Sequence, residues 1–416
     1  NAKVRENYSR RFRIRYPNEE LPAARPHQTT PLHDRLVAQG AVMGVTWGLE
    51  TPLWFAPQGV EPRDIVSFRR SNDFEHVGAE CRAVREAVGI TEIANFAKYE
   101  ITGPGAEAFL DRLMTNRLPK QGRMALTPML NHAGKLIGDF TIARIHSEHF
   151  LMWGSSQAEV YHMRWFDAHL PEDGSVTIRP INLGWVGLSI AGPKARDLLS
   201  RVTDEDVSNA AFPFMSSREM DVAAAPCQVS RISYTGDLGY EIWMAPEYEI
   251  RVYEALKAAG EDLGLKDFGM RALLCLRLEK NFGTWFREFR PIYGPYEADL
   301  GRFVALDKGD FIGRAAALAE RDGGGTLRRI CMSVEARDAD VIGDEPIWHE
   351  GKVVGWVTSG GYGHHVGLSL AQGYVPRKIA DDPAPGAFEI EIMGVKVKAT
   401  LLTQSPFDPK AERMRM

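Results

Sequence analysis

Apolar and polar residues alternate on both sides of a short turn-forming tract near the middle of the chain. The tract is Thr235-Gly-Asp-Leu-Gly239, flanked by residues 231–234 and by Tyr240 and Glu241. Alternation around glycine-containing turn residues predicts a β-hairpin. The pattern therefore places Glu241 on the second strand, just past the turn.

The chain contains one internal repeat of a strand, a Gly-Pro dipeptide and an amphipathic helix. Residues 101–114 resemble residues 190–203, and the two segments are 89 residues apart. Pro104 and Pro193 are expected at the first helical position, where the missing N–H of proline has no intrahelical partner to lose. This spacing is too long for a solenoid, so it predicts two related α+β subdomains.

The remaining patterns predict a mixed α+β fold that becomes all-β near the C-terminus. The expected helices cover residues 248–259 and 268–280, and a hairpin is expected from 140–145 and 150–154. After Asp322-Gly-Gly-Gly325, strands are expected at 326–334, 352–358, 371–375 and in a hairpin over 388–401. We therefore expect a small C-terminal β-barrel domain over residues 323–416.

Composition limits the function classes. The chain has 416 residues, 44% of them hydrophobic, and a net charge of −5, so it can bury more than one core. Neither the charge nor any apolar run favours nucleic acid or membrane partners. Its first residues, Asn-Ala-Lys-Val-Arg, are neither a signal peptide nor a Met start, which suggests a processed chain or part of a longer polypeptide.

The four cysteines lie far apart in the sequence, at positions 81, 227, 275 and 331. This spacing fits neither a disulfide framework nor a zinc site. We expect reduced, mostly buried thiols and a cytoplasmic or mitochondrial-matrix location. Two histidine pairs, His364-His365 and His146 with His149, have no Cys or carboxylate cluster nearby in sequence, so no metal site is expected.

Several tracts in order resemble one family. They are Glu80-Cys-Arg-Ala-Val-Arg-Glu86, Gly134-Lys-Leu-Ile-Gly-Asp139, Ser233-Tyr-Thr-Gly-Asp-Leu-Gly-Tyr-Glu241, Leu276-Arg-Leu-Glu-Lys280 and Val357-Thr-Ser-Gly360. The chain resembles the folate-binding T-protein (aminomethyltransferase) of the glycine cleavage system and, more closely, the C-terminal half of dimethylglycine and sarcosine dehydrogenases and oxidases. The resemblance implies two α+β subdomains around a central folate pocket, plus the barrel.

Site residues follow from this resemblance. Asp139 matches the acidic residue near folate nitrogens N5 and N10, where a carboxylate stabilises developing positive charge; otherwise it is a strand-initiating Asp after Gly138. Glu241 matches the glutamate that grips the pterin through its adjacent N–H donors, or else faces solvent on an ordinary hairpin. Tyr234 matches an aromatic residue of the folate pocket, or is a core aromatic with a satisfied hydroxyl. Arg277 is expected to contact the glutamate tail of folate or a substrate carboxylate. The alternative is an ion pair with Glu279 or Glu297.

The chain departs from the family at two places. T-proteins usually carry two consecutive acids where this chain has Gly138-Asp139, and the dehydrogenase relatives also depart there. Relatives commonly have glycine where this chain has Asp299.

The flavin half of the dehydrogenases has no counterpart here, because no GxGxxG motif follows a predicted strand. Residues 1–75 resemble the linker after that half, and residues 76–322 the folate-binding domain. FAD is therefore expected only on a partner domain or subunit. Aromatic and basic residues of this segment are expected to contact that partner; the alternative is that they close the segment's own small core. They are Arg10, Arg11, Phe12, Trp47, Trp54 and Phe55.

These observations lead to one main hypothesis and two alternatives. The main one is a tetrahydrofolate-dependent transferase that captures the methylene unit from oxidation of an N-methyl amine, such as dimethylglycine or sarcosine, as 5,10-methylenetetrahydrofolate. One alternative is a standalone folate-dependent demethylase or methyltransferase acting on an S-, O- or N-methyl compound. The other is a non-catalytic folate-binding module.

Overall fold

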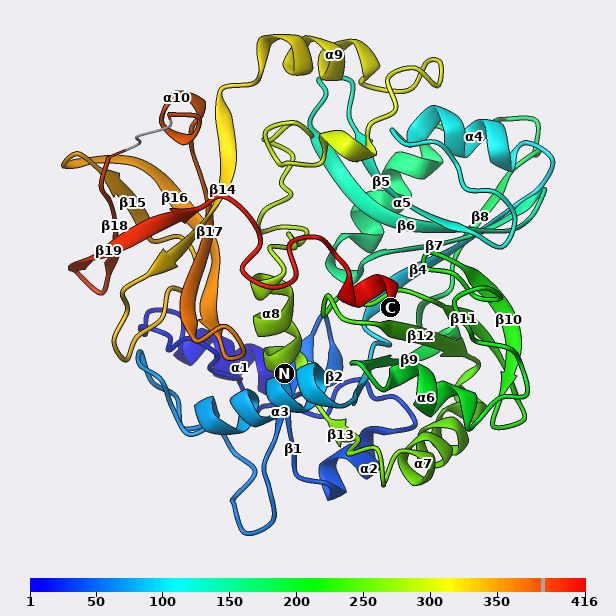
Figure 1. Ribbon diagram of the computed structural model, residues 1–416, viewed down its shortest axis with the longest axis horizontal. Helices are drawn as coiled ribbons and strands as arrows, with labels where there is room; N and C mark the ends of the chain where they lie inside the picture. The colour runs from blue at the N-terminus through cyan, green and yellow to red at the C-terminus, as the bar shows by residue number, and fades with distance from the viewer. Residues whose placement is uncertain (383–385) are drawn as a thin grey trace.

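Two large β-sheets, a small two-stranded sheet, a C-terminal barrel and the helices around them make up the computed structural model, which describes residues 1–382 and 386–416. The barrel lies to one side of the two large sheets. Helix α8 runs near the centre, between the barrel and these sheets (Figure 1). The mixed helix and strand content confirms the predicted α+β class.

The first subdomain is built on a five-stranded sheet in the order β5-β6-β7-β4-β8. Its strands are β4 (Phe96–Thr102), β5 (Met124–Leu130), β6 (Leu136–His146), β7 (His149–Ser155) and β8 (Thr177–Pro180). Helices α4 (Ala106–Leu113) and α5 (Glu159–Asp167) belong to the same subdomain. Phe109, Leu110 and Leu113 give α4 its buried stripe.

The second subdomain repeats this topology. A six-stranded sheet has the order β10-β11-β12-β9-β3-β13. Its strands are β3 (Gly89–Glu92), β9 (Val186–Ala191), β10 (Ser217–Val222), β11 (Ala225–Ser230), β12 (Gly239–Met244) and β13 (Lys266–Asp267). Helices α6 (Ala195–Ser200) and α7 (Glu249–Ala259) complete it. Both subdomains thus run strand, helix, three antiparallel strands, helix, which confirms the duplication expected from the repeat.

The position expected for the two repeat prolines is wrong. Helix α4 begins at Ala106 and α6 at Ala195, two residues after Pro104 and Pro193. The prolines lie in the preceding turn, where Gly103 and Gly192 have φ values of 113° and 133° that favour glycine. The Gly-Pro dipeptide therefore shapes the turn between strand and helix.

The predicted hairpin around residue 235 is present, but its connection is longer than the turn tract. Strands β11 and β12 pair antiparallel, with Ser230 opposite Glu241. Residues 231–238 form an irregular loop between them. The first flank of the pattern is therefore loop, whereas the second flank forms β12 and carries Glu241.

The N-terminal segment contains regular structure that the sequence patterns did not indicate. It forms α1 (Ala2–Ser9), α2 (His33–Ala38), β1 (Ala41–Thr46) and β2 (Leu49–Phe55), with β1 and β2 paired. Leu32, Leu36 and Leu49 pack into the core of the second subdomain, whereas α1 buries none of its residues.

Helices α3 (Phe74–Glu86) and α8 (Met270–Glu279) pack on β2, and α8 also contacts the barrel. Helix α9 (Arg314–Gly323) precedes the barrel. The barrel is closed, in the order β14-β17-β16-β15-β18-β19, which confirms the predicted C-terminal barrel. Its elements are β14 (Leu327–Val334), β15 (Pro346–His349), β16 (Lys352–Gly363), β17 (Leu368–Pro376), α10 (Arg377–Ala380), β18 (Phe388–Ile392) and β19 (Val395–Leu402). No helix in the described part of the chain has the length and apolar character needed to cross a bilayer.

Candidate functional site

The two sheets turn one face of each toward a shared interior. On β12, Tyr240, Ile242 and Met244 enter the core of the second subdomain, so Glu241 and Trp243 point to the other face. On β6, Phe140 and Ile142 enter the core of the first subdomain, so Asp139 shares the opposite face with Ala143 and Ile145.

Two tryptophans join these faces. Trp153 of β7 and Trp243 of β12 lie 5.8 Å apart between ring centroids, and both belong to a small apolar cluster between the sheets. Because Trp153 pairs with Thr141 on the face that carries Asp139, the contact brings the faces of Asp139 and Glu241 together. The structure thus directs these two predicted site residues, from different subdomains, into one interior, which we call the central site.

Asp139 is half-buried on β6, opposite Pro128 of β5. Burial raises the pKa of its carboxyl to about 7, against a smaller lowering by a backbone hydrogen bond. A carboxyl with this pKa exchanges its proton near neutral pH, as a group at a reacting centre often must.

Gly138 explains why the chain lacks a second acid beside Asp139. Gly138 faces away from the central site, and a Cβ placed on it would lie 2.5 Å from Cε2 of Phe140 and 3.1 Å from Nε2 of His162. The Phe140 ring therefore occupies the space that an acidic side chain would need.

Gly138→Ala is expected to lower the free energy of unfolding by about 1–3 kcal/mol, because the packed Phe140 ring must move to admit the methyl group. Urea denaturation would measure the change. Gly323→Ala is the control, because its Cβ would meet nothing within 4 Å. Equal stabilities of the two variants would contradict this packing.

Glu241 is half-buried in the middle of a polar row that crosses the six-stranded sheet. Its direct neighbours are Ser189 of β9 and Ser230 of β11. Burial raises the pKa of Glu241 to about 7, and the indole N–H of Trp243 opposes this shift. The carboxylate thus sits among small hydroxyl groups rather than facing bulk solvent.

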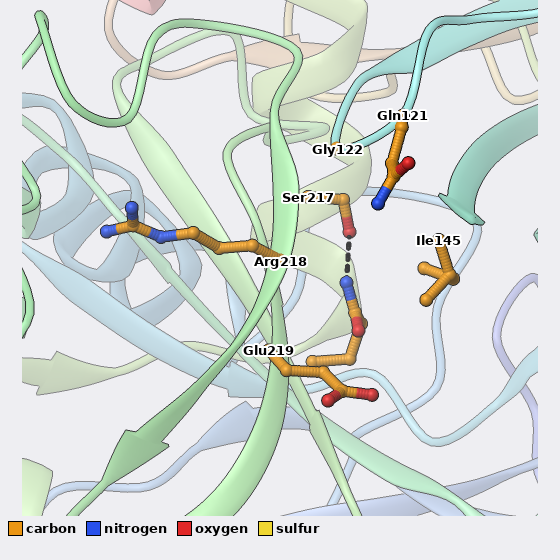
Figure 2. A pocket seen from close by; sticks show the side chains of 7 residues that line it. Gln121, Gly122, Ile145, Ser217, Arg218 and Glu219 are labelled. Atoms are coloured by element: carbon orange, nitrogen blue, oxygen red, sulfur yellow. Dashed lines mark hydrogen bonds between the residues drawn. The ribbon is translucent and has the colours of Figure 1, made fainter.

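At the outer end of this row lies a recess of about 510 Å³ (Figure 2). Buried Ser217 donates or accepts a hydrogen bond with Ser230 at 2.8 Å, and it accepts one from the Gln228 amide at 2.8 Å. Glu219 also lines the recess, but the four residues predicted for the site do not.

Tyr234 lies in the loop before β12. Its hydroxyl donates to the Gly283 carbonyl oxygen at 2.6 Å, and its ring stacks against Phe282 at 6.0 Å. Burial raises the pKa of Tyr234 to about 12, while Arg277 lowers it and Asp139 raises it. Tyr234 and Arg277 donate to neighbouring backbone carbonyl oxygens, those of Gly283 and Phe282. The Tyr234 hydroxyl is satisfied, as in the core alternative, but its ring is only half-buried.

Arg277 forms an ion pair, but not with the partners expected from the sequence. Its Nη1 lies 3.3 Å from Oε2 of Glu288 and donates to the Phe282 carbonyl oxygen at 2.9 Å. Glu279 instead pairs with Arg85, and Glu297 with Lys135. The expected pairing is wrong because Glu279 points to the α3 side of α8.

Glu288 is a residue of this wall that the sequence patterns did not single out. It is fully buried; burial acts to raise its pKa, but Arg277 and the hydroxyls of Ser359 and Thr358 together lower it. Thr358 Oγ1 of the barrel donates to Glu288 Oε1 at 2.6 Å. The barrel therefore helps to fix Arg277.

The second departure from the family pattern, Asp299, adopts a φ of 61°, which accounts for the glycine common in relatives.

Two buried donors near the central site have no hydrogen-bond partner among the residues that the structure describes. They are the indole N–H of Trp153 and Nε of Arg277. Buried donors of this kind are costly unless a ligand or water satisfies them. No group of three or more His, Cys, Asp or Glu side chains within residues 1–382 and 386–416 is arranged to hold a metal ion.

The fold is a duplicated α+β unit followed by a closed β-barrel, and comparison with known proteins specifies the family. The family model "GCVT N-terminal domain" matches residues 32–308, and "Glycine cleavage T-protein C-terminal barrel domain" matches residues 328–408. The chain belongs to this glycine cleavage T-protein (aminomethyltransferase) family.

Longer relatives match nearly the whole chain. Dimethylglycine dehydrogenase, mitochondrial, of Mus musculus is 36% identical over 97% of this chain and 46% of its own length. Pyruvate dehydrogenase phosphatase regulatory subunit, mitochondrial, of Mus musculus is 30% identical over 93% of this chain and 47% of its own length. The chain therefore spans about half the length of these relatives. Aminomethyltransferase T from Bartonella henselae has the same fold, with a TM-score of 0.78 at 22% identity over 92% of this chain and 98% of that chain.

Proposed function

We propose that this chain transfers a one-carbon unit to tetrahydrofolate, capturing the methylene group released by oxidation of an N-methyl amine as 5,10-methylenetetrahydrofolate. The observation that carries the proposal is the pair of half-buried carboxyls, Asp139 and Glu241, which reach one interior from two subdomains. Burial raises the pKa of each to about 7.

The residues present fit tetrahydrofolate. The Glu241 carboxylate supplies two acceptors for the adjacent N–H donors of a pterin. The Tyr234 and Phe282 rings offer an aromatic wall for a flat ligand, and the unpartnered Nε of Arg277 offers a donor to a carboxylate tail. When bound, tetrahydrofolate supplies the nucleophilic nitrogens that accept the one-carbon unit.

Asp139 supplies the charge that this transfer needs. A carboxylate beside an iminium-type donor stabilises its positive charge and holds it in place without reorganising. Proton exchange near pH 7 also suits Asp139 to accept the proton that a folate nitrogen loses as it forms the new C–N bond.

We further propose that a flavin-containing partner supplies the donor, with FAD bound only there. The dehydrogenase relative is about twice as long as this chain and is named for an N-methyl amine. Helix α1 and the residues after it expose apolar side chains for docking, with Val4 70%, Phe12 92% and Ile14 77% exposed. Trp54 is fully buried in the chain's own core and is not available to a partner. The mitochondrial names of the relatives support a matrix location in a eukaryote, or the cytoplasm otherwise.

Anaerobic calorimetry with tetrahydrofolate tests the proposal. We expect micromolar binding by the folded chain, followed by formation of 5,10-methylenetetrahydrofolate from formaldehyde faster than in buffer. A folded chain that releases no heat of binding would contradict the proposal. Formation of 5-methyltetrahydrofolate from a methyl compound would instead favour a standalone demethylase.

A non-catalytic folate-binding module is the second candidate, because one relative is named a regulatory subunit. Such a module would bind tetrahydrofolate but would not accelerate transfer from formaldehyde. The half-buried Asp139, which a module that only binds does not need, favours catalysis.

A further inference from the structure

Helices α3 and α8 are joined by three pairs of side chains spaced along their shared face. At one end Asp73, the residue before α3, accepts from Arg271 at 2.8 Å, and at the other Arg85 donates to Glu279 at 2.8 Å. Between these ion pairs, Cys81 of α3 meets Cys275 of α8. Residues four apart share one face of a helix, so Cys81 and Arg85 of α3 face Cys275 and Glu279 of α8.

The two cysteines pack in one cluster between α3 and α8, although 194 residues separate them in sequence. Cys81 is fully buried, and its Sγ lies 3.7 Å from the Ala272 carbonyl oxygen, on the same helix as Cys275. Both cysteines are reduced. The wide spacing in the sequence therefore concealed a close pair, held from both sides by ion pairs.

Cys275 is reachable by small molecules. It is half-buried and lines a cavity of about 230 Å³ together with His364 of the barrel and part of the N-terminal segment. A water molecule takes up about 30 Å³ of liquid, so a small peroxide fits this cavity. His364 packs against Phe74 of α3 at 4.7 Å between ring centroids, which holds its imidazole at the helix pair.

The surroundings favour the thiolate of Cys275 over that of Cys81. The hydrogen bond from Cys81 is the largest cause that lowers the pKa of Cys275; burial opposes it, and His364 adds to the lowering. The same contact and burial raise the pKa of Cys81. By contrast, burial raises the pKa of Cys227 to about 12 and that of Cys331 to about 11. Because the thiolate is the nucleophile, Cys275 is the reactive member of the four.

We propose that Cys81 and Cys275 form a peroxide-reactive dithiol that closes to a disulfide between α3 and α8. The Cys275 thiolate attacks a hydroperoxide oxygen, which forms an S–O bond, breaks the O–O bond and releases water or an alcohol after proton uptake. The Cys81 sulfur then attacks the Cys275 sulfur, which forms the S–S bond and expels hydroxide that leaves as water with the Cys81 proton. The thiols lose two electrons and the peroxide gains them.

Limiting hydrogen peroxide on the reduced, folded chain tests this proposal. Non-reducing peptide mapping is expected to show one new cross-linked peptide pair, containing Cys81 and Cys275, while Cys227 and Cys331 stay as thiols. We expect Cys275 to react at least about tenfold faster than Cys227. Equal rates for the two, or oxidation of Cys275 without the cross-link, would overturn the proposal.

Four variants assign the steps. Cys81→Ser should leave a sulfenic acid on Cys275 that a 1,3-dione traps, Cys275→Ser should abolish the fast phase, and Cys227→Ser should change neither. His364→Gln should slow the first step several-fold. Thermal unfolding of each variant checks its fold, and the wild-type map decides the question even where a variant fails to fold. A trapped adduct on Cys81 in the Cys275→Ser variant, formed at the wild-type rate, would reverse the assignment.

Discussion

Glu241→Gln is expected to weaken tetrahydrofolate binding by about 30- to 1000-fold, or about 2–4 kcal/mol. The carboxylate offers two charged acceptors to adjacent N–H donors. The amide keeps one neutral acceptor and turns its own NH₂ toward a donor. Calorimetry under anaerobic conditions measures the change. Glu219→Gln, an exposed acid on the same sheet face, is the matched control and should bind like the wild type.

The pH dependence of binding separates a gripping role from a structural one. Because the pKa of Glu241 is raised to about 7, a ligand that needs the carboxylate should bind more tightly as pH rises from 6 to 8 and then level off. The slope should approach tenfold per pH unit below the pKa and vanish in Glu241→Gln. A pH-independent affinity in the wild type would contradict the assigned role.

The stability of the fold changes with pH in the opposite direction to the binding affinity. A folded-state pKa raised from 4.5 to about 7 gives stability that is fully present below pH 4.5 and is lost as pH rises through 7. Glu241→Gln lacks this loss. The free energy of unfolding of Glu241→Gln, relative to that of the wild type, should therefore rise between pH 5 and 8.

Asp139→Asn is expected to slow one-carbon transfer by about 10²–10³-fold while leaving tetrahydrofolate affinity largely intact. The amide keeps the shape of the side chain but cannot stabilise positive charge or exchange the proton. Single-turnover formation of 5,10-methylenetetrahydrofolate measures the rate, and Glu172→Gln, an exposed acid in the same subdomain, is the control.

Stability distinguishes a chemical role for Asp139 from a packing role. Removing a desolvated carboxylate costs the fold nothing above its pKa of about 7, so Asp139→Asn should unfold at no lower temperature than the wild type at pH 8. If the variant lost only thermal stability and kept its transfer rate, the catalytic role would be wrong.

Much of the fold was predictable because its signals are local. Turn residues, Gly-Pro dipeptides and the change of period after residue 322 each act within a few positions. Contacts across the chain were not predictable from pattern. The partner of Arg277 is Glu288 rather than Glu279, because helix position turns Glu279 toward Arg85. The thiol pair depends on helix packing that no spacing in the sequence reveals.

The expected site was read from motif resemblance, and the structure supplies what resemblance lacks. Asp139 and Arg277 each shift the pKa of Tyr234, and Glu241 reaches the same interior from the other sheet. The indole pair and the buried Glu288 carry no local signature, because a tryptophan or glutamate in a strand or loop is equally consistent with packing.

The contact between Trp153 and Trp243 joins equivalent positions of the repeat, since Trp153 lies opposite Lys98 on β4 and Trp243 opposite Gly187 on β9. By the same correspondence, the counterpart of Glu241 is Leu151, opposite Glu100. The two halves are therefore alike in topology, and only the second presents this acid to the interior. Under the proposed function, the two unlike halves would hold different ends of one asymmetric ligand and so fix its orientation.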